Sequence, residues 1–194
     1  TTSLGRDYTG PYISQVASLD TTLRDYPYYI HFYAAANNGS AYNTVSDGNA
    51  MAKNVVTIGA VNDTVRDDSG AYVSGGSIAD FSSRGPSFDG RIKPDLTANG
   101  VGLISPESLT STDSKSGTSM ATPNASGSTT LLIDYINRKL PGHFFRSSTL
   151  RALLINTATD MGNAGPDYIY GFGIINVKAA ADIVKRYAEN PSTR

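Results

Sequence analysis

Two short apolar runs, residues 28–35 and 55–61, limit how this chain can fold more than any other feature. Both are almost continuously apolar, and the first is followed by Asn and Gly, a pattern typical of strands buried on both faces of a sheet. Apolar residues at helical spacing occur in residues 12–23, in residues 119–140 and again after Asn176. Buried strands between helices predict an α/β fold, a three-layer sandwich with a mainly parallel sheet.

Shorter segments complete the predicted architecture. Residues 78–81 and 96–104 are expected to form short strands, and the polar residues 64–76 an exposed hairpin or excursion. The pair Ser147 and Ser148 is expected to cap one helix and Asn176 to cap the last. The active residues of such a fold are expected at the carboxyl ends of its parallel strands.

The stretch Gly-Thr-Ser-Met-Ala-Thr-Pro at residues 117–123 places Ser119 between a small-residue turn and a long helical pattern. Free backbone N–H groups and the helix dipole favour negative charge at such a helix start. Acyl transfer needs this environment, because an oxyanion develops beside the attacking serine. Ser119 is therefore a candidate nucleophile, and the alternative is an ordinary capped helix start after a Gly/Ser turn.

This stretch resembles the nucleophile motif of the subtilisin-like serine proteases (subtilases). Five further blocks resemble family segments in the family's order: residues 3–5, 34–39, 54–61, 81–96 (Phe-Ser-Ser-Arg-Gly-Pro, then Asp-Gly-Arg-Ile-Lys-Pro-Asp-Leu) and 170–176. Their shared order indicates family membership rather than chance. The resemblance implies a subtilisin-like fold and a serine endopeptidase that hydrolyses peptide bonds through an acyl-enzyme on Ser119.

The resemblance also assigns the catalytic partners of Ser119. Asn37 matches the asparagine of the oxyanion hole, whose amide N–H acts together with the backbone N–H of the nucleophile. The alternative is a turn asparagine that follows a strand. Thr118 either supplies a supporting hydroxyl or has a purely structural role.

Five residues resemble the peptide-binding groove. Ser3, Leu4 and Gly5 look like the strand edge that pairs with an extended peptide, and glycine leaves room there for a bulky side chain. Ala35 and Ala36 resemble the floor and wall of the primary specificity pocket. Ala36 stands where the family usually has glycine, so its methyl group narrows the predicted pocket unless the neighbouring loop compensates.

The chain has only two histidines, and neither is suited to activate Ser119. His31 lies six residues before Asn37, about 20 Å away at the rise of a strand. His143 follows the long helix, near 30 Å from its start at about 1.5 Å per residue. A general base must come within about 3 Å of the hydroxyl.

The subtilase triad also contains an aspartate and a histidine, each in a motif before the nucleophile, and neither motif occurs here. Residues 1–194 are therefore expected to be the C-terminal portion of a catalytic domain whose N-terminal portion is missing, with 190–194 as a frayed tail. This chain alone is expected to be inactive, with the N-terminal portion of the same domain as its partner. The alternative is a non-catalytic peptide-binding fragment or pseudoprotease module.

Charge and composition narrow the remaining function classes. A formal net charge of −1 without a basic run argues against nucleic acid, and no apolar stretch approaches the roughly 18 residues of a membrane span. The absence of cysteine excludes a disulfide framework and a thiol nucleophile. No cofactor is expected; calcium is an alternative as a structural ion, although Asp67 and Asp68 are better explained as solvated turn carboxylates. The family resemblance implies a secreted or cell-envelope protein that acts on polypeptides.

Overall fold

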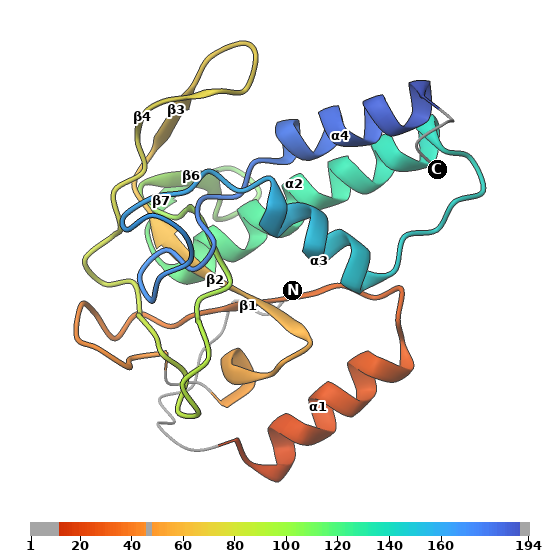
Figure 1. Ribbon diagram of the computed structural model, residues 1–194. Coiled ribbons are helices and arrows are strands. Elements are labelled where there is room, and N and C mark those ends of the chain that lie inside the picture. Colours follow the sequence, from red (N-terminus) through yellow and green to blue (C-terminus); the bar gives the residue numbers. More distant parts are fainter. Residues whose placement is uncertain (1–11, 46–47, 191–194) are drawn as a thin grey trace.

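The computed structural model describes residues 12–45 and 48–190 (Figure 1). The groove residues Ser3, Leu4 and Gly5 lie outside the described residues, as does the tail after Asn190. The predictions for both segments stay predictions.

A parallel three-stranded sheet lies at the centre, in the order β1 (His31–Ala34), β2 (Val55–Val61) and β5 (Leu96–Asn99). His31 is opposite Val55 in β1 and β2, and Ile58 is opposite Leu96 in β2 and β5. All seven residues of β2 are buried, which explains its unbroken apolar sequence. The predicted parallel sheet is confirmed.

Helix α1 (Ser14–Asp25) and the 3₁₀ turn η1 (Gly48–Met51) cover one face of the sheet. Val16 and Leu23 of α1 pack with Tyr33 of β1 in a buried cluster that also includes residues of η1 and β2. Helical spacing over residues 12–23 thus reflects a real amphipathic helix.

The other face is covered by α2 (Thr118–Lys139), with α3 (Ser147–Asn156) and α4 (Val177–Glu189) beside it (Figure 1). Leu132 and Ile136 of α2 belong to the main core cluster, together with buried residues of all three strands. Helices on both faces make the predicted three-layer α/β sandwich.

Two antiparallel hairpins project from these layers. One pairs β3 (Thr64–Arg66) with β4 (Tyr72–Gly75), as predicted for this polar segment. The other pairs β6 (Leu103–Pro106) with β7 (Thr112–Lys115) and leads directly into α2.

Three local predictions were wrong. Residues 96–104 form two strands, β5 and β6, because the chain turns at Gly102, where φ is 66°. Residues 78–81 form no strand and make only one bridge, between Ile78 and Val61.

Ser147 does not cap α3 with its side chain; it is the first residue of that helix, and its backbone N–H donates to Pro27 O at 2.7 Å. Asn176 does cap α4, as its side chain accepts from Ala179 N.

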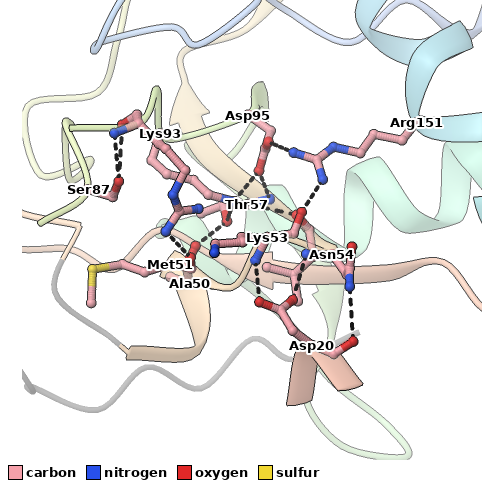
Figure 2. Close-up of polar contacts among 12 residues, drawn as sticks. Asp20, Ala50, Met51, Lys53, Asn54, Thr57, Ser87, Lys93, Asp95 and Arg151 are labelled. Atoms are coloured by element: carbon pink, nitrogen blue, oxygen red, sulfur yellow. Dashed lines mark hydrogen bonds and ion pairs between the residues drawn. The ribbon is translucent and has the colours of Figure 1, made fainter. Parts of the chain in front are cut away.

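A buried ionic network lies near the amino-terminal ends of the strands (Figure 2). Lys93 and Asp95 are 1% and 2% exposed, and Lys93 Nζ lies 2.5 Å from Asp95 Oδ2. Thr57 of β2 contributes its hydroxyl, 2.8 Å from Lys93 Nζ, and its N–H, 2.8 Å from Asp95 Oδ2. Arg151 of α3 pairs with the other Asp95 oxygen and also donates to Lys53 O, so the network ties a helix to the sheet.

The charges in this network shift the pKa values of their neighbours. Burial alone would raise the pKa of the Asp95 carboxyl, but the charges of Lys93 and Arg151 and the hydrogen bonds from Lys93 and Thr57 hold it below its usual value. Burial lowers the pKa of the Lys93 ammonium, and the nearby Asp95 carboxylate opposes that effect.

Candidate active site

Ser119 lies in the first turn of α2, at the end of the sheet opposite to the ionic network. The turn before it is fixed to the sheet, because Gly117 N donates to Gly100 O at 2.8 Å, just beyond the end of β5. A Cβ atom on Gly117 would lie 3.0 Å from Ser119 Oγ and 3.4 Å from Asn37 Nδ2. Glycine therefore leaves open the space between these two polar atoms.

Asn37 reaches the same space from the other side, three residues after the end of β1. Its Oδ1 accepts two hydrogen bonds from Thr118, from the backbone N–H at 2.9 Å and from the hydroxyl at 3.0 Å. Since these two donors hold the oxygen, the amide nitrogen faces the Ser119 side. The structure thus brings together Asn37, Thr118 and Ser119, residues separated by about 80 positions in the chain.

Thr118 is almost fully buried, and both of its donors are directed to Asn37. These contacts place it behind Asn37. We interpret Thr118 as a residue that orients the Asn37 side chain. This role is more specific than either alternative left open by the sequence, a supporting hydroxyl or a purely structural role.

The Ser119 hydroxyl lies 3.5 Å from Met120 Sδ, a weak acceptor that cannot serve as a general base. His31 begins β1, at the end of that strand far from Asn37, where Tyr29 OH lies 3.3 Å from its Nδ1; burial lowers the pKa of its imidazole. His143 lies past the C-terminal end of α2, whose 22 residues span about 33 Å. The elements that carry the two histidines thus place both far from Ser119.

The two predicted pocket residues differ in their surroundings. Ala35 is fully buried in the cluster beneath α1, and Ala36 is 9% exposed. Ala36 has φ of 85°, in the left-handed region that glycine adopts without strain. This backbone gives a physical reason for the glycine that the resemblance implies at this position. The assignment of Ala35 and Ala36 to the specificity pocket stays a prediction.

A third segment touches the site and received no role from its sequence. Ser83 N donates to Ala36 O at 3.0 Å, and the Ser83 hydroxyl accepts from Asn38 N at 3.0 Å. Its only sequence signal is its position in the Phe-Ser-Ser-Arg-Gly-Pro block, which resembles a family signature without indicating a contact.

Comparison with known proteins gives the family. The family model of the subtilases matches residues 2–173. The chain belongs to the subtilase family. It is 33% identical over 178 residues to Pyrolysin of Pyrococcus furiosus and 32% identical over 159 residues to Serine protease AprX of Bacillus subtilis. A plant relative, Subtilisin-like protease SBT6.1 of Arabidopsis thaliana, is 29% identical over 161 residues.

These relatives support a serine peptidase. The matches cover 78%, 75% and 79% of this chain, but only 12%, 33% and 14% of the respective relatives. The chain therefore spans a minor part of each relative, and the activity of the whole protein is a matter for proposal.

Proposed function

We propose that this chain supplies the nucleophile and the oxyanion hole of a serine endopeptidase. The observation that carries the proposal is the shared space beside Gly117, bordered by Ser119 Oγ and Asn37 Nδ2 within 3.4 Å of one point. A nucleophile and a hydrogen-bond donor around one open point fit the attack on a carbonyl carbon and the stabilisation of its oxygen.

In the proposed reaction, Ser119 Oγ attacks the carbonyl carbon of the scissile peptide and loses its proton to a histidine base. The carbonyl oxygen becomes an oxyanion that accepts hydrogen bonds from Asn37 Nδ2 and from the Ser119 backbone N–H. Collapse of this intermediate breaks the C–N bond, and the histidine returns the proton to the leaving amine. Water then attacks the acyl-enzyme with the same base, releases the acid and restores the Ser119 hydroxyl.

The base and its aspartate belong, in this proposal, to the N-terminal portion of the same domain. Strand β1 forms one edge of the three-stranded sheet in the described residues, and its Phe32, Tyr33 and Ala34 are buried. Parallel sheets normally continue with further covered strands, so we place the N-terminal portion against this edge. In this proposal Ser3, Leu4 and Gly5 pair with the polypeptide substrate, and Ala35 and Ala36 line its specificity pocket.

The proposed chemistry requires no cofactor. Calcium would be a structural ion only, and within residues 12–45 and 48–190 no three acidic or histidine side chains gather to hold one. Asp67 uses its Oδ1 to accept from Ser69 and Ala71 in the β3–β4 turn, which fits the solvated-turn interpretation. No described helix has the length and apolar character of a membrane span. A secreted or cell-envelope location is proposed from the family alone.

Peptide hydrolysis tests the proposal. A complete domain, with upstream residues joined to this chain, is expected to cleave a peptide substrate. Ser119→Ala should lower kcat by about 10⁶-fold and Asn37→Ala by about 10²–10³-fold, the magnitudes already known from a subtilisin. The isolated chain should show no turnover above the Ser119→Ala background.

Two outcomes would overturn this assignment. Steady cleavage by the isolated chain that Ser119→Ala abolishes would contradict the argument that the base lies upstream. A complete domain that binds peptides without cleaving them would instead favour the peptide-binding module.

A further inference from the structure

The backbone on both sides of Asn37 is held by one neighbouring segment. Ser83 N donates to Ala36 O at 3.0 Å, one residue before Asn37, and Ser83 Oγ accepts from Asn38 N at 3.0 Å, one residue after it. Phe81 O accepts from Gly39 N at 2.9 Å, which extends the contact by one more residue. Residues 81–83 thus run beside the loop that carries the proposed oxyanion donor.

Ser83 is suited to a rigid contact because it is fully buried. The Ser83 side of both hydrogen bonds is therefore shielded from water, whereas Asn38 is exposed, and a part-buried hydrogen bond of this kind contributes about 0.5–1.5 kcal/mol to the rigidity of the contact. The loop also needs such support, because Ala36 holds a left-handed φ of 85° that costs a non-glycine residue about 1–2 kcal/mol.

Thr118 and Ser83 act on different parts of Asn37. The two bonds from Thr118 fix the side-chain amide, whereas the two bonds of Ser83 fix the backbone from which that side chain projects. The direction of Nδ2 depends on both, since a shift of the backbone moves an amide that is anchored only through its oxygen.

The adjacent serine provides an internal comparison. Ser82 is also fully buried, but its hydroxyl accepts from Ala60 N at 3.0 Å, in the central strand β2. The Ser82 hydroxyl thus binds the central sheet, whereas the Ser83 hydroxyl binds the loop that carries Asn37.

We propose that Ser83 is a positioning residue for the oxyanion donor, which holds the Asn37 backbone so that Nδ2 meets the oxyanion. This inference rests on the proposed function. It assigns to Ser83 an effect on the transition state that acts only through Asn37.

The test uses the complete domain and compares Ser83→Ala with the matched control Ser82→Ala. Ser83→Ala is expected to lower kcat about tenfold with KM within about twofold, less than the 10²-fold that a 1 Å misplacement can cost. Ser82→Ala should change kcat by less than about twofold, even where both variants lose similar thermal stability. Ser83→Cys, nearly the same shape but a weak acceptor, should repeat the kcat loss if Ser83→Ala folds poorly.

A double-mutant cycle decides whether Ser83 acts through Asn37. In an Asn37→Ala background, Ser83→Ala should cause no further loss of kcat, because the donor that it positions is gone. A further tenfold loss in that background, or equal kcat losses for Ser82→Ala and Ser83→Ala, would overturn the inference. Failure of the unsubstituted domain to cleave peptides would instead reject the proposed function.

Discussion

The two ends of the parallel sheet differ in whether their polar groups find hydrogen-bond partners within the chain. At the amino end, the Asp95 carboxylate is fully buried and accepts from Lys93, Thr57 and Arg151. At the carboxyl end, Asn37 is exposed, and its Nδ2 makes no hydrogen bond within the part of the chain that the structure describes. The amino end thus satisfies its polar groups internally, whereas the carboxyl end leaves the Asn37 amide nitrogen and the Ser119 hydroxyl beside an open space, as the proposed function requires. The two ends of the sheet therefore differ in role, with a stabilising ionic network at one end and the proposed catalytic residues at the other.

The largest expected stability effect lies at the amino end. Lys93→Met removes the fully buried cation that pairs with Asp95 and should lower the free energy of unfolding of the complete domain by about 3–5 kcal/mol. Urea denaturation measures this loss. Lys185→Met, at an exposed ion pair with Glu189, is the control and should change stability by less than about 0.5 kcal/mol. Similar small losses in both variants would contradict the stabilising role of the amino end.

The same network predicts a dependence of stability on pH. The folded state holds the pKa of Asp95 below its usual value, so the contribution of this carboxylate is present above about pH 4 and is lost as pH falls through the lower folded value. The difference in free energy of unfolding between Asp95→Asn and the unsubstituted domain should therefore become smaller as pH falls from 6 to 3. Parallel curves for Asp95→Asn and the unsubstituted domain would reject this account.

The smallest effect is expected next to the site. Ala36→Gly relieves the left-handed backbone and should raise the free energy of unfolding by about 1 kcal/mol. Ala35→Gly, at a buried neighbour without a positive φ, should instead lower it by at least about 0.5 kcal/mol. Thermal unfolding of both variants shows whether each substitution raises or lowers stability. Destabilisation by both would show that no strain is stored at Ala36.

The sequence allowed the layers to be predicted because burial imposes a local pattern. The fully buried β2 is a nearly unbroken apolar run, and buried Leu132 and Ile136 of α2 recur at a four-residue interval that Leu140 continues just past the helix end. Strand limits were less accurate where backbone turns intervene, as at Gly102 between β5 and β6.

Contacts between distant segments could not be predicted from such patterns. The bond between Asn38 and Ser83 joins residues 45 positions apart, and the Thr57–Asp95 bond joins residues 38 apart. A buried lysine is also an exception to the rule that charges lie outside, so Lys93 gave no local sign of its burial. For Asn37 and Ser119, the resemblance to a family supplied the expectation of proximity, which hydrophobic periodicity alone could not.

Covalent labelling shows whether Ser119 is a nucleophile beside an oxyanion donor, as proposed. The complete domain is treated with an organophosphonate, which reacts with an activated serine, and the adduct is located by mass spectrometry. One label is expected, on Ser119, and it should be absent from Ser119→Ala. A label on another residue, or no label although the upstream histidine is assembled beside Ser119, would contradict it.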